Sequence, residues 1–334
     1  MYKLLLYTLK NQETALEYLA AQRKQCGFTL IEMMVTMLIS SALILLVSNL
    51  YISIFSSQRN QYEKAAMYEN ASTALTLLGK NIELAGYYPV NYGVDRTGNF
   101  NVAGQYSNSN VLQYTKVNNS LAYKYPLMGC TAQYWDSTKD ACTAYTKNED
   151  SDSIVLNYYT DDDSGNTGMG RDTGIAANCL RNGTDNVLNP NGTKVFLISN
   201  RYSLATTVRA YAENKAITIN NLACDVDNST SVGSTSGYQA LVEGIDQLRF
   251  SYLESIGLNT QYVTAKNVTD WSNVVAVKIC LVARSLLQTK AVESTYTLKD
   301  CDDTSVSYSD GISREKFSQI FSAKNNQGNM RMPQ

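Results

Sequence analysis

The 334-residue chain contains no histidine. This absence excludes Ser-His-Asp and Cys-His catalysis, imidazole metal sites and histidine-based pH switches. Charged residues are also scarce, at 17% of the chain, and the formal net charge is −2. A weakly acidic chain lacks the basic surface that binds nucleic acid phosphates. Carboxylate chemistry stays open, but no pair of carboxylates stands out among the many acidic loops. This composition disfavours an enzyme without excluding one, and we expect no cofactor and no nucleic acid partner.

Metal-binding patterns are missing as well. None of the seven cysteines forms a CxxC pair, which disfavours zinc and thioredoxin-like sites. The acidic, glycine-rich stretch at residues 160–172 does not keep the D-x-[DN]-x-[DN]-G register of a calcium loop. We expect no metal site and interpret this stretch as a solvated turn.

The cysteines themselves are unevenly placed. Cys26 precedes a long apolar run, and the other six follow it. An even number of cysteines in a polar domain beyond a membrane anchor predicts an oxidising compartment and disulfides, with scattered buried thiols as the alternative. Nearest-in-sequence pairing, one of several pairings that six cysteines allow, gives Cys130–Cys142, Cys179–Cys224 and Cys280–Cys301.

The apolar run covers residues 28–55 and has no glycine, no proline and a single charge, Glu32. A helix of about 20 apolar residues crosses a bilayer, so this run predicts a membrane span. Arg23 and Lys24 precede it, which places that end in the cytoplasm and the body in the periplasm. A cleaved secretory signal would have a shorter apolar core followed by a small-x-small site, so a signal anchor fits better.

A plain signal anchor does not explain Glu32. A carboxylate at the bilayer centre costs about 2.5–3.5 kcal/mol, and intramembrane ionisable residues usually have a partner. The helix dipole favours an anion in the first turn. If the chain were cut between Gly27 and Phe28, the new α-amine would lie one helical turn from this carboxylate.

The segment "KQCGFTLIEMMV" resembles the type III signal of type IV pilins and pseudopilins. In that pattern a basic leader ends in glycine, the mature protein begins with phenylalanine, and glutamate is its fifth residue. The resemblance implies that a prepilin peptidase removes residues 1–27, cuts after Gly27 and methylates the amine of Phe28. It also implies that Glu32 pairs with a mature N-terminus in the filament. The leader is long for this family, which leaves open a translation start downstream of Met1.

The helix is expected to continue beyond the membrane. After residue 55 the sequence turns polar but keeps an apolar stripe at helical spacing, Ala71, Leu75, Leu78, Ile82 and Ala85. Gly86 and Pro89 then predict its end. We divide the helix into a membrane half, residues 28–55, and an amphipathic periplasmic half, residues 56–86, that packs on a sheet. A coiled-coil stalk is the alternative.

Residues 87–334 read as a β-rich globular domain of short strands between Gly, Asn, Asp and Ser loops. The strand candidates are residues 111–116, 153–160, 193–199, 216–220, 238–253 and 273–285, whereas residues 312–324 fit a helix or a strand. In residues 273–285 we expect Val275, Val277, Ile279 and Leu281 to share one buried face.

Three further segments carry a second resemblance. The segments "ALVEGIDQLRFSYL", "WSNVVAVKICLVARS" and "SREKFSQIFSAKNN" are similar to the C-terminal half of PilW-type minor pilins, and the first also resembles the J-type minor pseudopilin of type II secretion. The resemblance implies an α+β pilin fold, with a long N-terminal membrane-spanning helix packed on an enlarged antiparallel β-sheet domain.

The PilW resemblance further implies a structural, non-enzymatic protein of type IV pilus assembly. It would prime assembly in a tip complex with other minor pilins and the major pilin, and help present a tip adhesin. The chain would span the inner membrane before assembly and reach the pilus surface afterwards. The alternatives are a J-type pseudopilin, a surface adhesin whose body binds a ligand, and an anchored periplasmic enzyme.

We predict that Gly27→Glu blocks removal of the leader, because the peptidase requires a small residue before the cut. Mass spectrometry of N-terminal peptides should find methylated Phe28 in the parent and an intact leader in this variant. Gly27→Ala, which keeps a small residue, is the matched control and should retain cleavage. Normal maturation of Gly27→Glu would show that the motif has been misread.

Overall fold

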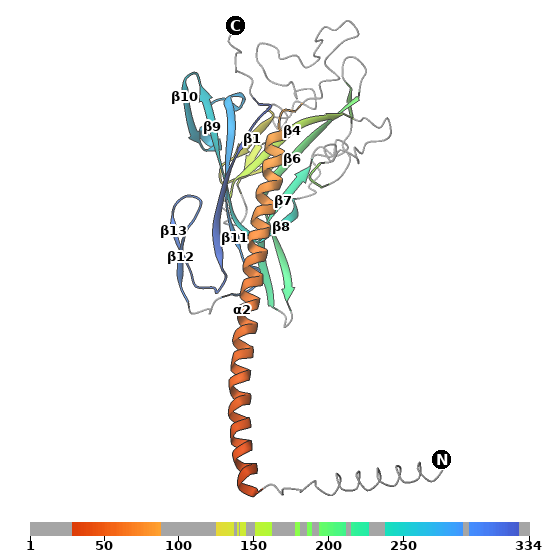
Figure 1. Ribbon diagram of the computed structural model, residues 1–334. Helices are drawn as coiled ribbons and strands as arrows, with labels where there is room; N and C mark the ends of the chain where they lie inside the picture. Colours follow the sequence, from red (N-terminus) through yellow and green to blue (C-terminus); the bar gives the residue numbers. More distant parts are fainter. Residues whose placement is uncertain are drawn as a thin grey trace, which may run out of the picture. The chain divides into compact units, whose positions relative to one another are not determined.

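The computed structural model describes residues 29–87, 125–136, 139, 141–144, 151–161, 178–180, 186–188, 194–211, 215–226, 238–289 and 294–326 (Figure 1). Its chain separates into two units, Met1–Arg59 and Asn60–Gln334. A single continuous helix, α2 (Leu30–Leu84), contributes residues to both units. Gly27, Phe28 and the strand predicted at residues 111–116 lie outside the described residues.

The first unit is the apolar part of α2. Its large apolar side chains are exposed, from Leu30 through Phe55. Among the described residues, α2 is the helix long and apolar enough to cross a membrane. So large an apolar surface does not persist in water, because contiguous exposed apolar patches mark contacts with lipid or with protein partners.

The second unit contains the amphipathic part of α2. The predicted stripe is confirmed, since its five members are buried together with Met67, Ala74 and Gly79. The predicted stop is also confirmed. Gly86 adopts a φ of +81°, a left-handed conformation that favours glycine. Its N–H donates to the carbonyl of Asn157 at 2.8 Å, which anchors the end of the helix to a strand.

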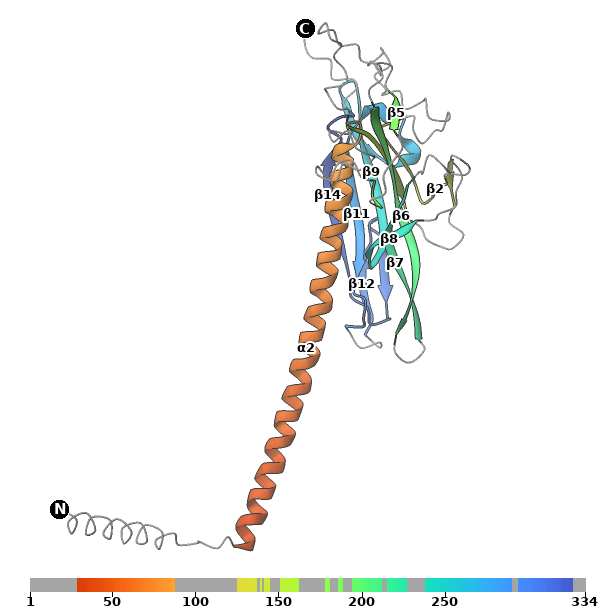
Figure 2. The same cartoon turned by 90° about the vertical axis from the view of Figure 1, so that its right-hand side faces the viewer.

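Two antiparallel sheets make up most of the domain (Figures 1 and 2). The larger sheet has the order β1-β4-β6-β7-β8, with β5 also paired to β6. Its strands are β1 (Leu127–Cys130), β4 (Ser153–Asp161), β5 (Asn186–Leu188), β6 (Lys194–Tyr211), β7 (Lys215–Val226) and β8 (Gln239–Glu243).

The second sheet has the order β10-β9-β11-β14. Its strands are β9 (Ile245–Ile256), β10 (Asn259–Val263), β11 (Val274–Arg284) and β14 (Arg314–Ser322). Two hairpins complete the described strands, β2 (Tyr134–Asp136) with β3 (Ala141–Thr143), and β12 (Tyr296–Lys299) with β13 (Ser305–Tyr308). The short helices η4 (Ala265–Asn267) and η5 (Trp271–Asn273) connect β10 to β11. The α+β pilin fold expected from the sequence is therefore present.

The single strand predicted at residues 238–253 is wrong, because the chain forms β8 and β9, which belong to different sheets. Gly244 separates them with a φ of +74°. Its N–H donates to the carbonyl of Asn220 in the first sheet, and its own carbonyl accepts from the N–H of Arg284 in the second. A glycine at this position lets one residue connect both sheets.

Four other predicted segments need adjustment. The strands predicted at residues 193–199 and 216–220 are parts of the longer β6 and β7, and residues 312–324 contain a strand, β14. In β11 a register shift between Val274 and Ala276 puts Val274, not Val275, in the core. Val277, Ile279 and Leu281 are fully buried as predicted, but Cys280 and Val282 on the other face are buried as well.

One face of both sheets packs against α2 within the second unit. On the four-stranded sheet this inner face carries Phe250 and Tyr252 of β9 and their cross-strand partners Ile279 and Val277 of β11. On the six-stranded sheet, Asn200 of β6 donates its side-chain N–H to the Asn81 side-chain oxygen on α2 at 2.8 Å.

The helix and the four-stranded sheet approach each other closely at Gly79. A Cβ atom built at this glycine would overlap the ring of Phe321 on β14. A methyl group at this position would force the ring or the helix to move, because cores are close-packed.

We predict that Gly79→Ala lowers the free energy of unfolding. Overpacking costs about 1–3 kcal/mol, which outweighs the gain of about 1 kcal/mol in helix propensity. Denaturant unfolding of the full chain in detergent would measure the change. In a Phe321→Ala background, which removes the overlapping ring, the same substitution should be neutral or stabilising. Equal losses in both backgrounds would contradict the proposed steric origin.

Candidate functional site

The carboxylate of Glu32 is bound within the first turn of α2. The Thr29 N–H donates to Glu32 Oε2 at 2.9 Å, and the Thr29 hydroxyl donates to the same oxygen at 3.0 Å. In return, the Glu32 N–H donates to Thr29 Oγ1 at 3.3 Å. This reciprocal arrangement is a capping box, which satisfies N–H groups that a helix start leaves unpaired. The sequence analysis missed Thr29, although T-x-x-E before an apolar run is the signal of a capping box.

Capping leaves half of this carboxylate available. Every hydrogen bond to it involves Oε2, and among the described residues Oε1 has no hydrogen-bond partner. One oxygen can therefore cap the helix while the other accepts from a cation. Cleavage after Gly27, methylation of Phe28 and pairing of Glu32 with an amine stay predictions.

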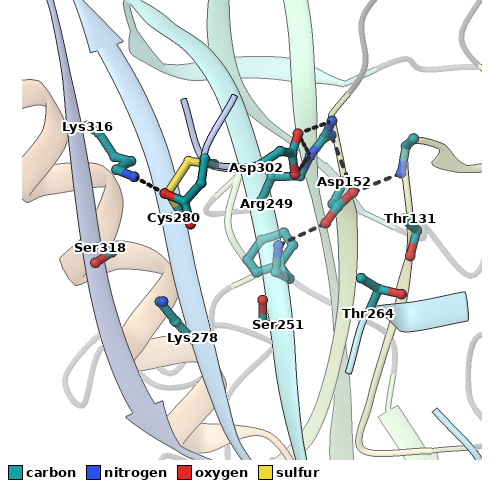
Figure 3. Close-up of a pocket in the computed structure, with 14 residues that line it drawn as sticks. Thr131, Asp152, Arg249, Ser251, Thr264, Lys278, Cys280, Asp302, Lys316 and Ser318 are labelled. Atoms are coloured by element: carbon teal, nitrogen blue, oxygen red, sulfur yellow. Dashed lines mark hydrogen bonds and ion pairs between the residues drawn. A yellow bond between two sulfur atoms is a disulfide. The ribbon is translucent and has the colours of Figure 1, made fainter. Parts of the chain in front are cut away.

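Three disulfides lie in the β-rich domain, in the pairs that nearest-in-sequence order gives. Their Cα–Cα distances are 5.6 Å for Cys130–Cys142, 6.4 Å for Cys179–Cys224 and 5.7 Å for Cys280–Cys301. The last one joins β11 to the turn between β12 and β13. It draws that turn against the outer face of the four-stranded sheet, the face that does not pack on α2 (Figure 3).

A polar pocket of about 210 Å³ lies on this outer face (Figure 3). Strand residues line its floor, and Thr131, Thr264 and the turn of Cys301, Asp302 and Asp303 line its walls. The floor is formed by Arg249 and Ser251 of β9, Lys278 and Cys280 of β11, and Lys316 and Ser318 of β14.

Most charges of the pocket are paired with each other. Arg249 Nε lies 3.1 Å from both carboxylate oxygens of Asp302, and an Arg249 terminal nitrogen lies 3.5 Å from Asp152 Oδ1. Burial raises the pKa of the Asp152 carboxyl, and this effect is opposed by N–H donors from the backbone and by the charge of Arg249. Lys316 lies 2.8 Å from Asp303, and this hydrogen bond and charge lower the pKa of the Asp303 carboxyl.

Lys278 is the exception. Its side chain is exposed, and it has no ion pair among the described residues. Its cross-strand partner on β9 is Ser251. The sequence analysis did not single out the pocket cations. Lys278 interrupts the apolar run of residues 274–283, and this break is the signal that would have indicated it.

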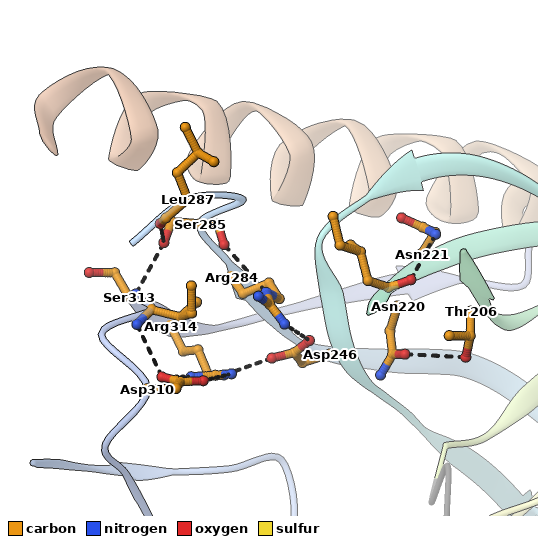
Figure 4. A network of polar contacts seen from close by, with 12 residues as sticks. Thr206, Asn220, Asn221, Asp246, Arg284, Ser285, Leu287, Asp310, Ser313 and Arg314 are labelled. Carbon is orange, nitrogen blue, oxygen red and sulfur yellow. Dashed lines mark hydrogen bonds and ion pairs between the residues drawn. The ribbon is translucent and has the colours of Figure 1, made fainter. Parts of the chain in front are cut away.

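A second polar network lies beside the pocket, around Asp246, Arg284 and Arg314 (Figure 4). In the same region Glu63 of α2 accepts the N–H of Leu287. Asp246 lies between two cations, 2.6 Å from Arg314 and 3.7 Å from Arg284. Arg314 also forms two hydrogen bonds to Asp310. Because these charges neutralise one another, we interpret this network as a structural clamp. Within the described parts of the chain, no group of three or more Cys, Asp or Glu is arranged to hold a metal ion.

Exposed apolar side chains gather at the hairpin of β9 and β10. Leu258 at its turn is fully exposed, and Ile256 and Tyr262 are about half exposed. The hairpin lies at the end of the domain where α2 ends (Figure 1). At this end Asn325 donates to the carbonyl of Glu83 on α2.

Two family models match the chain. The model of the type IV pilus-assembly protein W matches residues 202–325, which contain the four-stranded sheet and its side of the outer-face pocket. The model of the prokaryotic N-terminal methylation motif matches residues 22–48, which contain the capping box of Glu32. Together these matches support a type IV pilin-like minor pilin that is membrane-anchored and pilus-associated. The pilin-type domains point to a structural protein. Comparisons with curated proteins and with solved structures find no match.

We predict that Glu32→Val and Glu32→Gln both lower incorporation of this pilin into filaments while leaving its membrane level unchanged. Each removes the charge that would pair with the amine of Phe28, and breaking a buried pair costs about 3–5 kcal/mol. Glutamine keeps an oxygen that can accept from Thr29, so it separates capping from charge pairing. Blots of membranes and sheared filaments would measure both quantities.

The matched control is Glu69→Gln, an equal substitution at an exposed position of the same helix. It should leave incorporation unchanged. Full incorporation of Glu32→Gln would show that capping, not the charge, is what assembly requires of this residue.

Proposed function

We propose that this minor pilin primes type IV pilus assembly in a tip complex and helps present a tip adhesin. The observation that carries the proposal is the Glu32 carboxylate at the start of an exposed apolar helix, whose Oε1 accepts no hydrogen bond from the described residues. Its partners would be the major pilin, other minor pilins and the prepilin peptidase.

The apolar half of α2 supports a role inside a filament as well as in the membrane. Its side chains need an apolar environment, which lipid provides before assembly and neighbouring helices provide afterwards. The N-terminus would lie in the cytoplasm and the β-rich domain in the periplasm. After assembly the domain would reach the cell surface as part of the pilus.

The position of Glu32 and the apolar hairpin together favour a place below the topmost subunit. A topmost subunit has no neighbour above it whose amine would require a carboxylate. The exposed side chains of Ile256, Leu258 and Tyr262 offer an apolar surface at the end of the domain where α2 ends. Such a surface suits contact with the next subunit of a tip complex.

The test is a deletion strain complemented with the parent gene. Surface pili should fall in the deletion and return on complementation, with an unchanged amount of major pilin in membranes. Mass spectrometry of sheared filaments should find this pilin in small amounts relative to the major pilin. Normal piliation together with lost protein secretion would instead favour the J-type pseudopilin function. A purely adhesive protein would leave the number of pili unchanged and lower only attachment.

A further inference from the structure

The outer-face pocket has the features of a binding site that pilus assembly does not explain. It lies on the face of the four-stranded sheet that α2 does not cover, and it occupies about 210 Å³. That volume is below the usual size of drug-binding sites and suits a ligand of about one sugar ring.

The ion pairs within the pocket indicate that its ligand carries a negative charge. Arg249 is bound to Asp302 and Asp152, and Lys316 is bound to Asp303. Each of these cations therefore already has a carboxylate partner. Lys278 alone among the pocket cations makes no ion pair in the described part of the chain, although its charge also acts on Asp303, so it is the group that a ligand anion would meet.

The other lining groups indicate which further groups the ligand carries besides its anionic group. Hydroxyl groups come from Thr131, Ser251, Thr264 and Ser318. The carboxylates of Asp302 and Asp303 can accept further hydrogen bonds from a ligand, because a carboxylate has about four acceptor positions. A ring that carries several hydroxyl groups and one carboxylate matches this set.

We propose that the pocket binds a sugar acid, with its carboxylate on Lys278 and its hydroxyl groups on the surrounding hydroxyl and carboxylate side chains. The Cys280–Cys301 disulfide fixes the wall that carries Asp302 and Asp303, so the site is pre-organised. Pre-organisation matters here because a small polar ligand gains little from apolar burial.

Calorimetric titration of the full chain in detergent micelles would test the proposal, with sodium galacturonate as the probe. Galactose has the same ring size without the carboxylate, and acetate has the carboxylate without the ring. We expect galacturonate to bind about tenfold or more tightly than either, since one charge-assisted hydrogen bond is worth about that factor.

Lys278→Gln should weaken galacturonate binding by about tenfold or more, and it should leave galactose binding unchanged. Lys64→Gln, an equal substitution at an exposed position of α2, is the matched control and should bind like the parent. Equal binding of galacturonate and galactose would overturn the proposal, as would parental affinity in Lys278→Gln or a lack of heat at saturating probe. Piliation of the Lys278→Gln strain should be normal, so this site and the assembly function can fail independently.

Discussion

The packing of α2 on the inner faces of both sheets is the contact on which the rest of the domain depends. Small residues make it possible, because Ala71, Ala74 and Gly79 let the helix backbone come close to the strands. Large side chains from the sheets, such as Phe321 and Phe250, then fill the space that these small residues leave. The arrangement assigns one face of each strand to the core by its period of two. The opposite face of each sheet does not contact α2, so only other parts of the chain can cover it.

On the four-stranded sheet, a loop and a disulfide cover part of that opposite face. The Cys280–Cys301 bond anchors the turn, and Arg249 and Lys316 hold its carboxylates. Buried or partly buried charges need such partners, because an unpaired one is costly to desolvate. The pocket is the part of this face that the turn does not cover. The pocket is polar because α2 packs on the opposite face of the sheet. Among the described residues, the exposed Lys278 is the pocket cation that makes no ion pair with the covering turn.

Local patterns explain how far the sequence predicted this fold. The stripe from Ala71 to Ala85 and the stop at Gly86 depend on residues within a few turns of each other, and both predictions are confirmed. The sheet switch at Gly244 was missed because it depends on partners in two sheets, Asn220 and Arg284, that lie far away in the sequence. The bulge that puts Val274 in the core is likewise a property of the pairing, not of the strand alone.

The pocket could not be predicted from the sequence for the same reason. Arg249, Lys278 and Lys316 belong to three strands, and only the register of β9, β11 and β14 brings them to one face.

The Glu32 carboxylate shows how a local signal and a distant partner can act on one side chain. Its position in the first turn is where an anion in a membrane helix costs least, because the helix dipole is favourable and the polar interface is near. Capping by Thr29 uses one oxygen and keeps the side chain folded along the start of the helix. Oε1 accepts no hydrogen bond from the described residues of this turn. A cation that bound to it would therefore stabilise the carboxylate further. A carboxylate fully satisfied by its own helix would be cheaper to insert in lipid but useless for joining subunits, whereas an uncapped one would cost more before assembly. The capping box is thus a compromise between insertion and pairing, and it follows from a threonine placed three residues before the glutamate.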